Sequence, residues 1–251
     1  FTQDGVAHEL ACDIIAGCDG FHGVSRSSPA VGVLRTFDRI YPFGWLGILA
    51  EAPPSSEELI YANHERGFAL LSMRSPTVQR MYLQCAPDED IEAWSDDRIW
   101  SELSVRLASD GFRLHTGRII QKSVTPMRSF VAEPMQCGRL FLAGDSAHIV
   151  PPTGAKGMNS AIGDVLLLAR AIEGWYGSGD DTGLEGYSAA ALRRIWSVQR
   201  FSWWMTTLFH RFDGANEFDR RVQLAELDQV MTSRPAATAF AENYVGLPIA
   251  A

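Results

Sequence analysis

The segment from Ala69 to Cys85 constrains the fold most, because apolar and polar residues alternate along it on both sides of a turn at residues 75–77. Successive side chains of a strand point to opposite faces of a sheet, so this alternation predicts a hairpin with one apolar and one polar face. The polar face carries four side chains that can form hydrogen bonds: Ser72, Arg74, Arg80 and Tyr82.

The polar face of this hairpin has two interpretations. Antiparallel sheets often expose one face to water, and the pattern alone favours such a solvated face. The other interpretation is a binding site for a carboxylate, because an arginine can bind a carboxylate through two parallel hydrogen bonds. Serine and tyrosine hydroxyls would add further donors. The sequence pattern leaves this second interpretation open.

The pattern of the rest of the chain predicts a mixed α/β (α+β) fold. Apolar alternation between about Arg39 and Arg128 predicts an antiparallel sheet, interrupted by a helix over 96–109. Short strands are predicted on either side of this region, and helices after it: strands over 9–16 and 138–145, helices over 157–172, 184–211 and 217–232. This order predicts a sheet domain inserted between two halves of another domain.

A glycine-rich stretch, GDSAHIVPPTGAKGMNSAIGD, runs from Gly144 to Asp164. It lacks the spacing of a phosphate-binding P-loop. Asp145 and His148 could bind a metal, but the sequence offers no obvious third and fourth ligand. We therefore expect no metal site. The favoured interpretation is a helix start whose free N–H groups near Met158 bind an anionic ring, and an ordinary helix N-cap remains the alternative.

Composition limits the partners that this chain can have. The 251 residues carry 22 basic and 30 acidic side chains, a net charge of −8, with no basic cluster, which argues against nucleic acid or an anionic membrane as partner. No apolar run is long enough to span a bilayer, and no signal peptide is visible. The four cysteines lack metal-binding spacing, and we expect buried free thiols in a cytoplasmic protein.

Two motifs resemble those of class A flavoprotein monooxygenases, a family of flavin-dependent aromatic hydroxylases. One is Asp19-Gly20 followed by Ser25-Arg26, and the other is Gly144-Asp145 followed by residues 151–154. Longer stretches also resemble aromatic-acid hydroxylases of this family: CDGFHGVSR, YPFGWLG, ELIYANHERGFAL, GRLFLAGDSAHIVPPTGAKG, RFSWWMT and AENYVGLP. The resemblance covers nearly the whole chain.

The resemblance implies an oxidoreductase that uses FAD, NADPH and O₂. The expected reaction is hydroxylation of 4-hydroxybenzoate to 3,4-dihydroxybenzoate, in which a flavin hydroperoxide attacks the substrate phenolate. The resemblance also implies a homodimer. Four regions are expected: residues 1–35 as the end of an FAD-binding Rossmann-like domain, 36–128 as the substrate-binding sheet domain, 129–175 as the returning FAD-binding segment, and 176–251 as a helical interface region.

The family's glycine-rich nucleotide fingerprint, G-x-G-x-x-G, does not occur in this sequence. We therefore expect an N-terminally truncated chain, which does not begin with Met.

The resemblance also assigns roles to individual residues. Tyr61, Tyr244 and Pro152 match catalytic positions, the two tyrosines forming a relay from the phenolic oxygen. Residues that match substrate-binding positions are Ser72, Arg74, Tyr82, Arg80 and Thr153. Residues that match FAD-binding positions are Asp19, Asp145, Lys156, Gly157, Met158 and Asn159, and His22 and Arg128 match positions associated with NADPH.

Two alternatives remain. The chain could belong to a hydroxylase of another phenolic acid, such as 3-hydroxybenzoate, although the pairing of two tyrosines with a carboxylate site argues against this. It could also be a non-catalytic fragment that binds no flavin, because the nucleotide fingerprint is absent from it.

Overall fold

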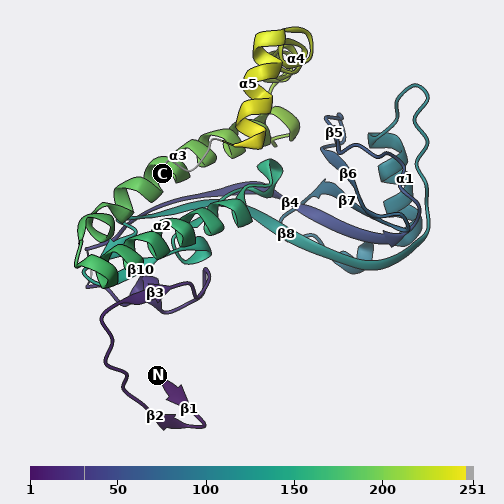
Figure 1. Ribbon diagram of the computed structural model, residues 1–251. Coiled ribbons are helices and arrows are strands. Elements are labelled where there is room, and N and C mark those ends of the chain that lie inside the picture. The colour runs from purple at the N-terminus through teal and green to yellow at the C-terminus, as the bar shows by residue number, and fades with distance from the viewer. Residues whose placement is uncertain (31, 247–251) are drawn as a thin grey trace. The chain divides into compact units, whose positions relative to one another are not determined.

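The computed structural model describes residues 1–30 and 32–246 and divides into two compact units (Figure 1). Unit 1 comprises residues 1–39 and 129–200, and unit 2 comprises residues 40–128 and 201–251. Residue 31 of the predicted first region and residues 247–251 of the predicted interface region lie outside the described residues.

The structure confirms the mixed α/β class. The helices are α1 (Asp96–Arg106), α2 (Gly157–Ser178), α3 (Thr182–Phe209), α4 (Glu217–Thr232) and α5 (Arg234–Val245). The strands are β1 (Thr2–Gln3), β2 (Val6–Ala7), β3 (Ile15–Gly17), β4 (Arg35–Glu51), β5 (Ile60–Ala62), β6 (Ala69–Ser75), β7 (Val78–Cys85), β8 (Arg118–Glu133), β9 (Gln136–Cys137), β10 (Leu140–Leu142) and β11 (His148–Ile149). They form sheets of order β1-β2, β3-β10-β9 and β11-β8-β4-β7-β6-β5.

Three sequence predictions need correction. The strand predicted over 9–16 is confined to Ile15–Gly17, because its parallel partner β10 offers only three residues for pairing. Helix α5 lies within the region 176–251 predicted to be helical, but the individual helices predicted there end at residue 232. The prediction of buried thiols is wrong, since Cys12 and Cys18 are exposed while Cys85 and Cys137 are half-buried.

The sheet of unit 2 has two faces that its strand register defines. Ser72 of β6 lies opposite Arg80 of β7, and Leu70 lies opposite Tyr82. Tyr61 of β5 lies opposite Leu70, which puts all these residues on one face of the sheet. Gly47 of β4 is the register partner of Tyr82 and belongs to the same face.

The opposite face of this sheet is mainly aliphatic and largely buried. Leu46, Leu71 and Leu83 have no exposed surface, and they pack with Ile99 and Leu103 of α1. Met73 lies on the same face, because its register partner is Gln79, and it is 43% exposed near the hairpin turn.

Helix α1 covers the aliphatic face because its sequence provides both a start signal and an apolar stripe. The Ser95 side chain caps the helix by accepting a hydrogen bond from the Arg98 N–H at 3.3 Å. Asp96 and Asp97 occupy the first turn, where negative charge is favoured. Ile99 and Leu103, four residues apart, are both fully buried.

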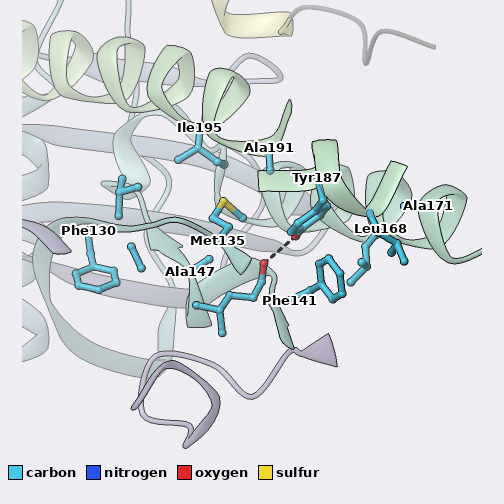
Figure 2. Packing of buried hydrophobic residues seen from close by; sticks show 13 residues of the cluster. Phe130, Met135, Phe141, Ala147, Leu168, Ala171, Tyr187, Ala191 and Ile195 are labelled. Carbon is cyan, nitrogen blue, oxygen red and sulfur yellow. Dashed lines mark hydrogen bonds between the residues drawn. The ribbon is translucent and has the colours of Figure 1, made fainter. Parts of the chain in front are cut away.

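The core of unit 1 lies among β10, α2 and α3 (Figure 2). The Tyr187 hydroxyl of α3 donates a hydrogen bond of 2.7 Å to the Leu142 carbonyl of β10, the contact dashed in Figure 2. The Tyr187 and Phe141 rings are nearly perpendicular, with their centroids 5.5 Å apart. Helices α2 and α3 approach closely at Gly163, where an added Cβ would lie 2.0 Å from an Arg194 guanidinium nitrogen.

Candidate active site

The face of the unit 2 sheet that carries Tyr61, Ser72, Arg80 and Tyr82 is not a solvated surface. Trp45, Phe68 and Leu70 on this side are at most 5% exposed. They form an aromatic cluster in which Tyr61 and Tyr82 are partly buried. The solvated-face interpretation of the hairpin is therefore wrong, because aromatic rings cover much of that face.

Tyr61 and Tyr244 are brought together within unit 2. Their hydroxyl oxygens lie 3.5 Å apart, although the residues are 183 positions apart in the sequence. Burial, followed by the contact with Tyr244, raises the pKa of the Tyr61 hydroxyl above its usual value near 10. Tyr61 therefore stays neutral and can donate a hydrogen bond to a negatively charged oxygen.

The structure brings the residues predicted to bind a carboxylate only partly together. Ser72 and Tyr82 are half-buried on the same sheet face as Tyr61, as the register requires. Arg74 is exposed and lies at a register shift between Met73 and Ser75, so it has no direct partner on β7. A bulge can redirect a side chain out of the normal alternation, and the arginine is therefore free of the rigid pairing that holds Ser72.

Arg80 is packed tightly against its neighbours on this face. Its guanidinium carbon lies 5.0 Å from the centre of the Tyr82 ring. A Cβ added at Gly47 would come within 2.8 Å of an Arg80 terminal nitrogen and 3.2 Å of the Tyr82 ring, so the glycine makes room for both. The buried Nε of Arg80 has no hydrogen-bond partner among the described residues. A buried donor of this kind suits a bound acceptor.

In unit 1, Asp19 organises the turn that follows β3. Its carboxylate accepts a hydrogen bond of 2.8 Å from the Ser25 N–H, and this bond lowers the pKa of the carboxyl group. A Cβ at Gly23 would lie 2.0 Å from the Asp19 carboxyl carbon, so only glycine fits there. Arg26 then joins this turn to the next loop, because it donates a 2.8 Å hydrogen bond to the Ser146 carbonyl.

The loop that contains Asp145 is supported by a buried contact between a histidine and an aspartate that the sequence pattern did not indicate. The 3₁₀ turn η3 (Gly144–Ser146) holds Asp145 in an exposed position. The Asp164 carboxylate accepts a hydrogen bond of 3.0 Å from the Gly144 N–H and lies 2.6 Å from His148 Nε2. The signal in the sequence was an aspartate sixteen residues after a histidine, which is too weak to use alone.

The start of helix α2 fits an anionic ligand. No side chain caps this end of the helix, and Met158 and Asn159 are exposed there. Free N–H groups at the first turn of a helix favour negative charge. Lys156 is only 6% exposed, and burial lowers its pKa. The start of α2 therefore offers backbone donors that would suit an anionic group such as the ring of a flavin.

The remaining predicted site residues are placed as follows. In unit 1, Pro152 is exposed and Thr153 is fully buried in the 3₁₀ turn η4 (Pro152–Gly154). His22 is exposed in the turn that Asp19 organises. In unit 2, Arg128 is half-buried on β8.

A cavity of about 550 Å³ in unit 2 is lined by residues such as Arg66, Gln84 and Arg211, and it contains none of the predicted site residues. Within residues 1–30 and 32–246, no three histidine, cysteine, aspartate or glutamate side chains gather as a metal site would require. Across the same residues, no helix combines the length and the apolar character that a membrane span needs.

Comparison with known proteins gives a sequence relative of high similarity. The chain is 51% identical over 249 residues to a p-hydroxybenzoate hydroxylase of Acinetobacter baylyi. The match covers 99% of this chain and 62% of the relative, so the chain spans about three fifths of that protein.

Solved structures show the same fold at low sequence identity. A p-nitrophenol 4-monooxygenase of Pseudomonas putida has a TM-score of 0.70 at 17% identity, covering 94% of this chain and 60% of that one. A Diels-Alderase of pyrroindomycin biosynthesis has a TM-score of 0.72 at 18% identity, covering 94% and 50%. Because these two proteins are named for different reactions, the shared fold alone does not determine the reaction.

The model of one protein family, described as FAD binding domain, matches residues 1–202, which is most of this chain. The match includes the Asp19 turn, the Asp145 loop and the start of α2. The chain therefore belongs to the FAD-binding domain family.

Proposed function

We propose that this chain is part of an FAD-dependent 4-hydroxybenzoate 3-monooxygenase, which hydroxylates 4-hydroxybenzoate to 3,4-dihydroxybenzoate with NADPH and O₂. The observation that carries the proposal is the pair of Tyr61 and Tyr244 hydroxyls, 3.5 Å apart. Tyr61 shares a sheet face with Ser72 and Tyr82. The name of the Acinetobacter relative supports the same substrate.

The carboxylate of the substrate would be held by Ser72, Arg74 and Tyr82. The two hydroxyls are fixed on the sheet, while Arg74 sits at the bulge and can turn its guanidinium toward the ligand. A bidentate arginine bond sets both the position and the direction of a carboxylate. The buried, unpartnered Nε of Arg80 gives this face a further donor.

The phenolic oxygen of the substrate would be bound by Tyr61. A phenolate ring is much more electron-rich than a phenol, so ionisation activates the ring carbon beside the oxygen. Because the pKa of Tyr61 is raised by burial, its proton stays in place and stabilises the phenolate as a hydrogen-bond donor. The neighbouring Tyr244 hydroxyl can accept and pass on the proton that the substrate releases.

FAD would be held by residues of unit 1. The uncapped start of α2, from Gly157 to Asn159, would bind the electron-accepting end of the ring, and Asp145 on its exposed turn would bind the ribityl chain. Asp19 would act by fixing the turn that follows β3. When bound, FAD supplies the oxidising chemistry by taking electrons from NADPH and activating O₂.

The finer assignments complete the proposal. His22 and Arg128 would contribute to NADPH binding, Pro152 would have a catalytic role, and Thr153 would have a role in binding substrate. The whole protein would act as a cytoplasmic homodimer. These assignments rest on the family resemblance of the matching positions.

The substitution Tyr61→Phe tests the proposal in the protein extended to the length of its relatives. It removes one hydrogen bond to the phenolate and keeps the ring, so the pKa of the bound phenol should rise by about one unit. The dissociation constant of 4-hydroxybenzoate should change little at a pH where the phenol is neutral. The share of NADPH oxidised without product formation should increase. Spectral titration and the ratio of product formed to NADPH consumed measure these effects.

Tyr176→Phe is the matched control, because Tyr176 is 63% exposed on α2 and its hydroxyl donates to Asp13 at 3.0 Å. It should behave like the wild type. If Tyr61→Phe also behaves like the wild type, Tyr61 does not bind the phenolic oxygen. If the wild type binds 3-hydroxybenzoate in preference to 4-hydroxybenzoate, the hydroxylase of another phenolic acid is the correct reading.

A further inference from the structure

His210 is a fully buried histidine at the C-terminal end of α3, in the aromatic cluster of unit 2. Its ring is stacked on Phe43, with centroids 4.7 Å apart and planes 6° apart. The centroid of the Phe68 ring lies 4.5 Å from the centroid of the same histidine ring, with the two planes tilted by 31°. The role proposed above for Tyr61 and Tyr82 makes no use of this histidine.

The two ring nitrogens of His210 have separate partners that define its protonation. Trp45 Nε1 lies 2.6 Å from His210 Nε2, and an indole nitrogen can only donate, so Nε2 is the acceptor and carries no proton. Nδ1 lies 3.0 Å from the Thr206 carbonyl, which can only accept, so Nδ1 carries the proton. His210 is therefore a neutral imidazole in one fixed tautomer. Burial supports this state, because it lowers the pKa of His210 to about 3.

The rings that contact His210 also contact the two tyrosines proposed to bind substrate. On one side, Trp45 packs against the Tyr82 ring with centroids 4.7 Å apart. On the other side, Phe68 packs against the Tyr61 ring at 5.8 Å. The His210 ring is thus linked through one intervening residue to Tyr82, proposed to bind the substrate carboxylate, and through another to Tyr61, proposed to bind the phenolic oxygen.

We propose that His210 is a positioning residue that sets the orientation of both tyrosines, of Tyr82 through its hydrogen bond with Trp45 and of Tyr61 through its ring contact with Phe68. The inference rests on the proposed function, since it concerns the substrate site of that reaction. The two roles of the ring are separable. The Nε2 acceptor acts through Trp45 on the residue that would bind the substrate carboxylate, and the flat ring surface acts through Phe68 on the residue that would bind the phenolic oxygen.

Two variants of the full-length flavoprotein separate these roles. His210→Phe keeps a flat ring but leaves the Trp45 N–H without its acceptor. The dissociation constant of 4-hydroxybenzoate should rise roughly fivefold, the factor that one net hydrogen bond gives, while the pKa of the bound phenol stays near the wild-type value. His210→Gln keeps an acceptor and a donor but loses the ring. It should preserve the dissociation constant, raise the pKa of the bound phenol and lower the ratio of product to NADPH consumed.

Trp45→Phe tests the hydrogen bond from its other end, should the buried histidine not tolerate replacement. It should raise the dissociation constant as His210→Phe does. The double variant with Trp45→Phe and His210→Phe should bind 4-hydroxybenzoate no more weakly than either single variant, because it contains no unpaired indole N–H at this position. FAD content and thermal unfolding show which variants are folded.

The outcomes discriminate between the two levels of inference. If the folded variants match the wild type in dissociation constant, phenol pKa and coupling ratio, His210 only stabilises the core, and the inference is overturned while the proposed function stands. A wild type that neither binds nor hydroxylates 4-hydroxybenzoate overturns both. If both His210 variants fail to fold, an unchanged dissociation constant in Trp45→Phe overturns the hydrogen-bond role and with it the inference.

Discussion

The two faces of the unit 2 sheet are both largely buried, but they are built from different side chains. One face is mainly aliphatic, with Leu71 and Leu83 packed against α1. The other is aromatic, and the polar atoms of Trp45 and His210 are joined by a hydrogen bond. Aliphatic packing depends on volume, whereas a hydrogen-bonded ring cluster also fixes angles. The comparison indicates that the first face provides stability and the second provides orientation.

The largest effect is expected on the aliphatic face. Leu71→Ala should lower the free energy of unfolding by about 2–5 kcal/mol, because Leu71 is fully buried and its removal leaves a cavity. The dissociation constant for 4-hydroxybenzoate of the remaining folded protein should be unchanged. Urea unfolding and substrate titration measure the two quantities. A large loss of affinity in folded protein would mean that the two faces are not functionally separate.

Lowering the pH should destabilise unit 2 through His210 of the aromatic face. His210 has a pKa near 3 when folded and an ordinary value of 6.5 when unfolded, so its contribution to stability is present above pH 6.5 and is lost as the pH falls. Between pH 7 and pH 5 the loss should be about 2 kcal/mol. The rings of Phe43, Trp45 and Phe68 packed against it carry no charge. In His210→Gln this part of the pH dependence should disappear from unfolding curves measured at both pH values.

At the carboxylate end of the same face, Arg74→Lys should weaken substrate binding by about 1–3 kcal/mol. Lysine keeps the charge but loses the two-pronged geometry. The free energy of unfolding should not change, since Arg74 is exposed at a bulge. Titration with 4-hydroxybenzoate provides the measurement. An unchanged dissociation constant would remove Arg74 from the carboxylate site.

The smallest effect is expected for an exposed ion pair that belongs to neither buried cluster. The Arg118 guanidinium binds the Glu51 carboxylate through bonds of 2.9 and 3.0 Å, but the two side chains are 72% and 50% exposed. Arg118→Ala should lower the free energy of unfolding by less than about 1 kcal/mol. A larger loss in urea unfolding would show that the adjoining ends of β4 and β8, and not the buried faces of the sheet, limit the stability of unit 2.

Periodicity predicted the regular parts of this molecule well. The Ala69–Cys85 alternation correctly indicated a hairpin, and helix α4 occupies the predicted range. Capping explains the second success, because Asn216 and Asp219 form a reciprocal capping box that marks the start of α4 in the sequence. Strand 9–16 failed because its length depends on a partner that lies more than a hundred residues away.

The candidate site was only partly predictable, because its support comes from contacts between distant residues. The alternation of the hairpin put Ser72, Arg80 and Tyr82 on one face, and the register agrees with this. Nothing local indicated that Trp45 would meet His210, 165 residues later in the chain. The Asp164 carboxylate under Gly144 is a similar case. Side-chain types predict chemistry, but the partner of a buried polar atom follows only from the tertiary structure.

The contact between Gly163 and Arg194 has a consequence for how this sequence can vary. A Cβ at position 163 would overlap the Arg194 guanidinium, which is the far end of a flexible side chain. An alanine at position 163 therefore requires the Arg194 side chain to adopt another conformation, and a shorter residue at position 194 would remove the overlap altogether. The two positions can change in either order among related sequences.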